Sequence, residues 1–170
     1  MRSLFKKTSN RTRKSNKPFE YGSLEARQLL AVTTSFDAAT GELAINLADN
    51  NDIAVVDVAG GQVQVNGSDV VAISAVNSLD IDGDNTQANQ QVALNGSFIG
   101  ANSLQSVSVD NVNQLTVVGD YVITGDLNVT LVGADGGVGD ASTGRLTVGG
   151  TTDIDARNNG IFLNLSLIHI

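Results

Sequence analysis

The sequence contains no cysteine, no tryptophan, one proline and one histidine among its 170 residues. Without cysteine the chain can form neither a disulfide framework nor a thiolate metal site. The one histidine is His169, and any Ser/His/Asp set would have to use it. No apolar run approaches the roughly 18 residues that a membrane-spanning helix needs. We therefore expect no transmembrane segment and no enzymatic activity.

Positive charge is scarce outside one short segment at the start of the chain. Residues 1–17 carry seven basic residues and no acidic one, whereas from Gln28 onward there are sixteen acidic residues and only Arg145 and Arg157 are basic. Such an acidic body argues against nucleic acid as a ligand, because the phosphate backbone would repel it. We expect residues 1–22 to be a disordered basic leader. A nucleic-acid-binding arm is the alternative to an export leader.

The remainder of the chain has the composition of short β-strands. Aromatic residues make up 4% of the sequence, and most apolar residues are Val, Ile, Leu or Ala. Short segments alternate apolar and polar residues between Gly, Asn and Asp turns, a pattern typical of strands with one buried face. These segments are 43–47, 53–58, 63–65, 70–73, 79–81, 92–94, 107–109, 115–117, 127–131, 146–148 and 161–163.

Some of these segments also recur. The residues from Leu115 align with those from Leu146 at an offset of 31 positions (146 − 115), and the segment from Leu79 is a weaker third copy. Repeats of this length are typical of solenoids. A β-sandwich is the alternative, but large aromatic residues to fill its core are missing. We therefore predict an all-β fold in which residues 32–164 form a parallel β-helix, or β-solenoid.

The last of these repeats resembles a known family. Residues 146–164, LTVGGTTDIDARNNGIFLN, are similar to the repeats of filamentous-haemagglutinin-like and autotransporter-like surface proteins. The resemblance implies a right-handed parallel β-helix with a structural or adhesive role. Surface polysaccharide or other cells are the partners that an adhesive role would imply.

The segment between the leader and the body, residues 23–31 (SLEARQLLA), resembles the LEPR-XLL motif of very large bacterial exported proteins. Ala26 stands where that motif has proline, and we expect about two helical turns beginning at Ser23. The resemblance implies export to the cell surface or the extracellular space, with the export or sorting machinery as a partner. The matching residues are Leu24, Glu25, Arg27, Leu29 and Leu30.

The final residues 165–170, LSLIHI, match what one reading frame of a common transposase-based sequencing adapter encodes. We therefore expect that they are not part of the natural protein and that the β-repeat is interrupted near Asn164. His169 has no role in this interpretation. The chain is then expected to be an N-terminal fragment of a larger exported protein.

The best candidate metal site is the acidic segment that contains Asp80, Asp82 and Asp84. Alternating carboxylates suit Ca²⁺, which prefers oxygen ligands, although an EF-hand loop would place glycine at Asn85 and glutamate at Gln91. A solvated acidic turn is the alternative. Apart from possible Ca²⁺ we expect no cofactor and no catalytic residue. The alternative function is that of a Ca²⁺-stabilised carbohydrate-binding or carbohydrate-cleaving β-helix.

Overall fold

The computed structural model describes residues 32–86, 88–132, 137–140, 144–156 and 160–162. The chain is all-β, as predicted: the described residues form strands β1 to β15 and two short 3₁₀ helices, η1 (Ile73–Ala75) and η2 (Gly100–Asn102). The basic leader 1–22, the motif 23–31 and residues 163–170 lie outside the described residues.

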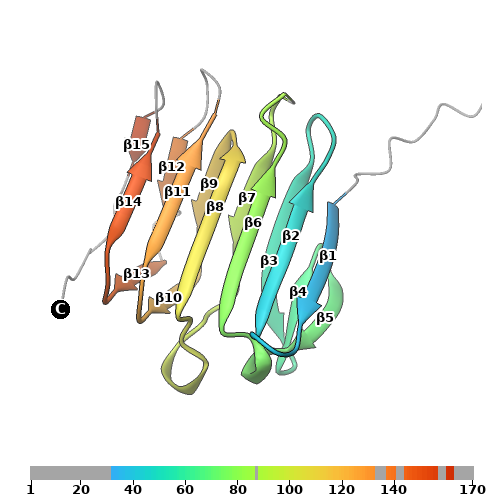
Figure 1. Ribbon diagram of the computed structural model, residues 1–170, viewed down its shortest axis with the longest axis vertical. Helices are drawn as coiled ribbons and strands as arrows, with labels where there is room; N and C mark the ends of the chain where they lie inside the picture. Colours follow the sequence, from blue (N-terminus) through green and yellow to red (C-terminus); the bar gives the residue numbers. More distant parts are fainter. Residues whose placement is uncertain (1–31, 87, 133–136, 141–143, 157–159, 163–170) are drawn as a thin grey trace, which may run out of the picture.

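The strands form three sheets (Figure 1). Sheet A contains, in spatial order, β1 (Val32–Asp37), β2 (Glu42–Leu47), β6 (Ser78–Gly83), β8 (Ser106–Val112), β11 (Leu127–Leu131) and β14 (Thr152–Asp155). Sheet B contains β15 (Gly160–Phe162), β12 (Gly137–Asp140), β9 (Gln114–Val117), β7 (Gln91–Leu94), β3 (Ile53–Ala59), β4 (Gln62–Val65) and β5 (Ser68–Ala72). Sheet C contains β10 (Asp120–Ile123) and β13 (Arg145–Val148).

Sheets A and B are mixed. All neighbours from β2 to β14 in sheet A and from β3 to β15 in sheet B are parallel. At the N-terminal end of the stack, β1 is antiparallel to β2, and β3, β4 and β5 form an antiparallel meander. This end therefore has a different construction from the parallel part of the stack.

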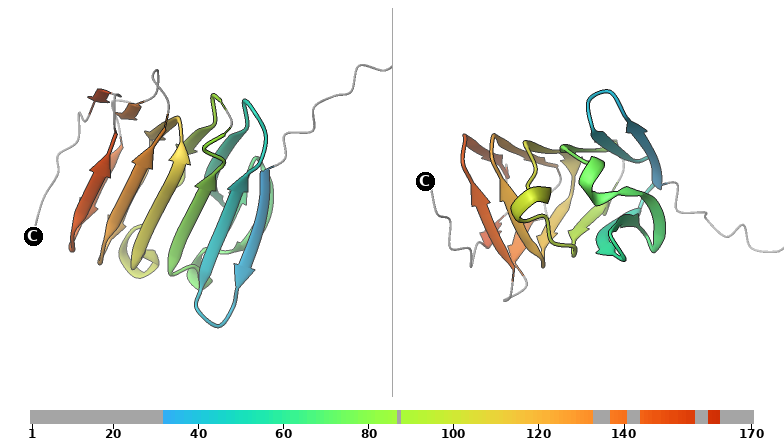
Figure 2. Two further views of the ribbon diagram at one scale, coloured as in Figure 1. Left: turned by 45° about the horizontal axis from the view of Figure 1, so that its top comes forward. Right: turned by 90° about the horizontal axis from the view of Figure 1, so that it is seen from below.

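The chain visits the sheets in a fixed order. Strands β8, β9 and β10 lie in sheets A, B and C, and β11, β12 and β13 repeat that sequence. Isolated parallel bridges from Phe98 to Tyr121 and from Leu104 to Ile123 extend sheet C to the preceding pass. We call one pass through the three sheets a coil. Figure 2 shows the sheet A strands of successive coils lying side by side.

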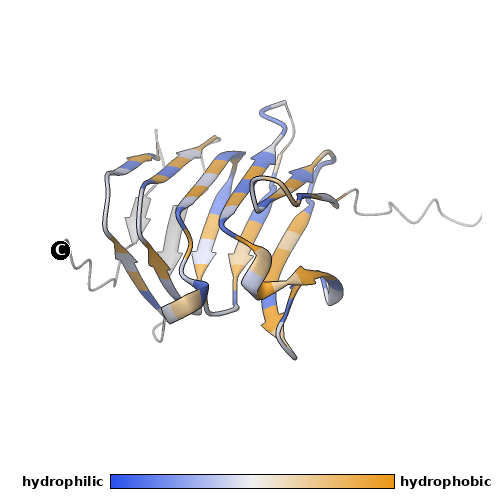
Figure 3. Cartoon of the chain, turned by 60° about the horizontal axis from the view of Figure 1, so that its bottom comes forward, coloured by the Kyte–Doolittle hydropathy of each residue, from blue (hydrophilic) through white to orange (hydrophobic). Residues whose placement is uncertain are grey.

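Residues at equivalent positions of successive coils stack in columns. Along sheet A, inward-facing residues alternate with outward-facing polar ones, and hydropathy alternates along the strands in Figure 3. The parallel register places like side chains above one another, so that each coil covers the apolar surface of its neighbour. One buried column of sheet A is Leu43, Leu79, Val107 and Leu127, and a second is Ile45, Ile81, Val109 and Val129.

The 31-residue alignment of Leu115 with Leu146 does not correspond to the strand pairing. Leu115 lies in sheet B and pairs with Val138, 23 positions later (138 − 115). Leu146 lies in sheet C and pairs with Tyr121, 25 positions earlier (146 − 121). The segment from Leu79 belongs to sheet A. The three sequence segments look alike because each presents an alternating aliphatic pair to the same interior, but they occupy different sheets.

Of the two aromatic residues buried in the described core, Tyr121 lies on β10 of sheet C and Phe98 is bridged to it. Phe98 and Tyr121 are both fully buried, with ring centroids 5.4 Å apart and ring planes tilted by 30°. The Tyr121 hydroxyl has no hydrogen-bond partner among the described residues. Burial raises the pKa of this hydroxyl, and the negative charge of Asp57 acts in the same direction. Tyr121 therefore acts as a protonated, space-filling side chain.

A single buried amide joins the turns between sheets A and B. The Gln90 side chain is fully buried, and its Nε2 donates to the carbonyl oxygens of Leu47 at 2.9 Å and Asp49 at 3.1 Å. Its Oε1 accepts a hydrogen bond from the Asp84 backbone N–H at 2.8 Å. One side chain thus satisfies three backbone groups that the corner would otherwise leave without partners.

The same corner is linked to the next coil by Asn113. The Asn113 Oδ1 accepts from the Gln90 backbone N–H at 2.7 Å, and its Nδ2 donates to the Val132 carbonyl oxygen at 2.9 Å. In the coil before that of Gln90, the position that corresponds to Gln90 is occupied by Asp52, and both side chains are fully buried. The side chains of Gln90 and Asn113, which directly precede β7 and β9, therefore connect the corners of consecutive coils.

We predict that Gln90→Met lowers the free energy of unfolding by about 2–4 kcal/mol, because it keeps the side-chain volume but leaves buried backbone groups unsatisfied. Urea denaturation of the full chain measures this value. Gln91→Met is the matched control, since Gln91 is exposed on β7 and its replacement should change stability by less than about 0.5 kcal/mol. Equal losses for the two variants would contradict the role of Gln90.

Candidate polar site on sheet A

The outward face of sheet A carries columns of polar residues. In register with one another are Asn46 on β2, Asp82 on β6, Asp110 on β8, Thr130 on β11 and Asp155 on β14. This face follows directly from the alternation of the strands, because residues that flank an inward aliphatic side chain must point outward. The face therefore presents carboxylates, amides and hydroxyls in rows that run along the stack.

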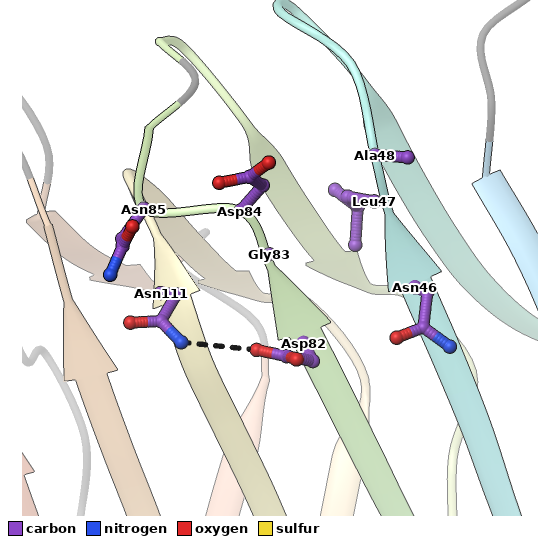
Figure 4. A pocket seen from close by; sticks show the side chains of 8 residues that line it. All are labelled: Asn46, Leu47, Ala48, Asp82, Gly83, Asp84, Asn85 and Asn111. Carbon is purple, nitrogen blue, oxygen red and sulfur yellow. Dashed lines mark hydrogen bonds between the residues drawn. The ribbon is translucent and has the colours of Figure 1, made fainter.

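The rows end in a hollow where β2, β6 and β8 finish. This hollow, which we call the Asp82 hollow, has a volume of about 410 Å³. Figure 4 shows the Asp82 and Asn111 side chains pointing toward one another from neighbouring strands, with Asn111 Nδ2 donating to Asp82 Oδ1 at 3.1 Å. The lining residues are Asn46, Leu47, Ala48, Asp82, Gly83, Asp84, Asn85 and Asn111.

Backbone irregularities shape the Asp82 hollow. Asn111 has a φ of 60°, in the left-handed region, and the pairing of β8 with β11 shifts register beside it. Asparagine tolerates this conformation better than most residues, and such a bulge re-aims a side chain. At Gly83, a Cβ would lie 2.6 Å from both the Asn111 carbonyl oxygen and Gln90 Oε1. Glycine is therefore required where the corner approaches the hollow.

The three residues of the predicted calcium site occupy different environments. Asp80 and Asp82 lie on the outward face of β6, and Asp82 and Asp84 line the hollow. Asp84 Oδ1 accepts hydrogen bonds from the Thr86 backbone N–H at 2.9 Å and from the Thr86 hydroxyl at 2.7 Å, so it organises its own turn. Within the described residues no group of three or more His, Cys, Asp or Glu side chains could hold a metal ion. Calcium binding stays a prediction.

Negative charges interact along the polar face. The pKa of the Asp80 carboxyl is raised above its ordinary value by partial burial and by the nearby charges of Asp82 and Asp110. Ser108, beside Asp80 in register, uses its hydroxyl to donate to Asp110 at 2.8 Å. Like charges on neighbouring strands of this face therefore disfavour ionisation of Asp80.

The remaining predicted site residues are those of the sorting motif. The motif residues Leu24, Glu25, Arg27, Leu29 and Leu30 lie outside the described residues. Asn111 and Gln90, which build the Asp82 hollow and the corner behind it, were not predicted from the sequence. The signal available for Gln90 and Asn113 was their place directly before the sheet B strands β7 and β9.

These observations define an all-β chain whose strands recur in a fixed order and whose outer face is polar. A family model described as "Repeats of unknown function (DUF5649)" matches residues 104–166, a range that includes β8 to β15. Searches of the curated proteins and of the solved structures gave no match. In the described part of the chain, no helix has the length and apolar character needed to cross a membrane.

We predict that Asp80→Asn raises the melting temperature at pH 7. Because the pKa of Asp80 is raised in the folded state, ionisation lowers stability as the pH rises through that pKa, and the stability is regained once the carboxyl is protonated below its ordinary value of 3.8. Thermal melts should show the gain at pH 7 and none near pH 3.

The charged neighbours provide a control for this prediction. In an Asp110→Asn background, the further gain from Asp80→Asn should shrink, because one source of repulsion has already been removed. High salt should also reduce the gain by screening. A gain of equal size at both pH values would show that the cause is not the carboxylate charge.

Proposed function

We propose that this chain is part of an exported β-repeat protein with a structural or adhesive role at the cell surface or outside the cell. In this proposal residues 32–164 form coils of a parallel β-helix. The strands β1, β4 and β5, which pair antiparallel, then cover part of its N-terminal end.

The observation that carries the proposal is the recurrence of strands in the order A, B, C with parallel register between coils. Each coil buries its aliphatic residues against the next, so the stack is held together by nearest-neighbour contacts. The match of residues 104–166 to a repeat family supports the same interpretation. A stack of this kind suits a rigid, elongated element.

The outer face supports an adhesive role. Carboxylates, amides and hydroxyls recur along sheet A at the spacing of neighbouring strands, roughly 4.8 Å. Groups of this kind hydrogen-bond the hydroxyls of polysaccharides. An acidic face would also disfavour nucleic acid as a partner.

The proposed export function depends on the start of the chain. The basic leader followed by Leu24, Glu25, Arg27, Leu29 and Leu30 resembles a sorting signature of large exported proteins. This resemblance supports export through recognition of the motif.

We predict that residues 1–35, fused to a reporter enzyme that is active only outside the cytoplasm, direct its export from a bacterium that makes LEPR-XLL proteins. Leu29→Ser should reduce reporter activity at least several-fold, because it removes an apolar residue of the motif. Leu4→Ser is the matched control in the leader. A reporter that stays in the cytoplasm, or equal losses for the two variants, would contradict the proposal.

A second candidate function is Ca²⁺-stabilised carbohydrate binding, and the Asp82 hollow is the observation that favours it. Two carboxylates and the side-chain amides of Asn46, Asn85 and Asn111 line this hollow. Oxygen-rich sites of this kind suit Ca²⁺, and the remaining amide groups suit sugar hydroxyls.

We predict that millimolar calcium raises the melting temperature of the full chain if this second function holds, and that Asp82→Asn removes the rise. Asp153 lies on the outward face of sheet A, on β14 and outside the hollow, so the variant Asp153→Asn should keep the calcium-dependent rise. Thermal melts with calcium, with magnesium and with a chelator measure the effect. An unchanged melting temperature in calcium would exclude calcium stabilisation.

A further inference from the structure

A groove opens at the N-terminal end of the stack, where the first strand of sheet A meets the last two strands of sheet B. Its volume is about 550 Å³. Strands β1, β4 and β5 lie together at this end in Figure 1. The groove is lined by Val32, Thr34, Val65, Asn66, Ser68, Asp69 and Val70.

The floor of the groove is the end of the apolar core. Val65 is buried, and Val32 and Val70 are half-buried and pack against the core cluster. The outer edge of β1 is polar, with Thr33 and Ser35 exposed. A stack of coils needs its terminal apolar surface covered. Strands β1, β4 and β5 cover part of this end and leave Val32 and Val70 partly open to solvent.

We propose that residues Leu24–Leu30 of the same chain bind in this groove and cover the N-terminal end of the core. Leu30 precedes Val32, a lining residue, by two positions, so the segment is tethered at the mouth of the groove. Leu24 is eight positions from Val32 (32 − 24), and an extended chain spans at most about 3.3–3.6 Å per residue. The leucines of this segment are therefore within reach of the groove along the chain.

Charge complementarity favours the same occupant. Asp69 is the charged residue among those that line the groove, and its Oδ1 accepts a hydrogen bond from Gln64 Nε2 at 2.7 Å. Arg27 is the only basic residue of the sequence between Lys17 and Arg145. The segment thus offers leucine side chains to pack on the valines of the groove and one arginine to pair with Asp69. This inference rests on the groove and not on the proposed export function.

Chemical crosslinking of the full chain tests the proposal. Because the natural sequence has no cysteine, Leu29→Cys and Ser68→Cys would supply the only two thiols, and Ser68 is exposed. A short bis-maleimide should join them within one chain. The matched control is the same pair in a Leu24→Ser, Leu30→Ser background, which keeps the tether but loses apolar side chains.

Binding in the groove should make intramolecular crosslinking about tenfold faster than in the serine background, because docking raises the effective concentration of the two thiols. Equal rates would overturn the proposal, since the tether alone would then explain the reaction. Crosslinks between chains would also overturn it, because a second copy would then occupy the groove.

Trypsin cleavage provides a second measurement that needs no change in the groove. The Arg27–Gln28 bond should be cut at least several-fold more slowly than the bonds after Arg11 and Arg13, and Leu24→Ser with Leu30→Ser should remove this protection. Rapid cleavage after Arg27 in the unaltered chain would overturn the proposal. Export of a reporter by residues 1–35 is independent of these results, so failure of either proposal can be recognised separately.

Discussion

In-register pairing of parallel strands is the constraint on which the rest of the structure depends. A side chain that faces inward on one coil lies directly above its counterpart on the next, as Ile45 lies beside Ile81 and Ile81 beside Val109. A shift by one residue would turn every aliphatic side chain of a strand outward and every carboxylate inward. The buried columns therefore fix the register, and the register in turn places the polar columns on the outer face of sheet A.

Differences in length between coils are confined to the segments that connect the parallel strands. Between Leu47 and Gln90 the chain passes through η1 and the antiparallel strands β4 and β5, yet the Gln90 amide reaches the Leu47 carbonyl oxygen. The coil from β3 to β7 is long, since Ile53 pairs with Gln91 38 positions later (91 − 53), whereas the next coil is shorter, since Gln91 pairs with Gln114 23 positions later (114 − 91). Coil length therefore varies while the strand register is kept. Buried amides such as that of Gln90 satisfy the backbone where the turns differ.

The individual strands could be predicted from the sequence because alternation is a local property. The segments around Leu43, Leu79 and Leu115 all lie on strands of the structure. Their partners could not be predicted in the same way, because sheets A, B and C all present short alternating aliphatic segments to one interior. Leu115 and Leu146 look alike for this reason although they lie in different sheets.

The residues of the candidate site also differ in whether a local pattern could predict them. Asp82 and Asp84 were recognisable from their local spacing, and both line the hollow. Asn111 and Gln90 were not, because their roles depend on contacts with residues 29 (111 − 82) and 43 (90 − 47) positions away. A local pattern cannot distinguish a buried amide from a solvated one when its partners are set by the pairing of coils.

The two faces of the stack place opposite demands on its ends. Aliphatic columns gain stability from each added coil, so the core ends wherever stacking ends and must be covered there. The polar columns gain no such stability, since neighbouring carboxylates such as Asp82 and Asp110 repel one another along the row. Growth of the stack therefore strengthens the interior while it accumulates negative charge outside. Stacking therefore leaves two different surfaces, which are an outer face rich in carboxylates and, beside the half-buried Val32 and Val70, an end of the core that strands β1, β4 and β5 cover in part.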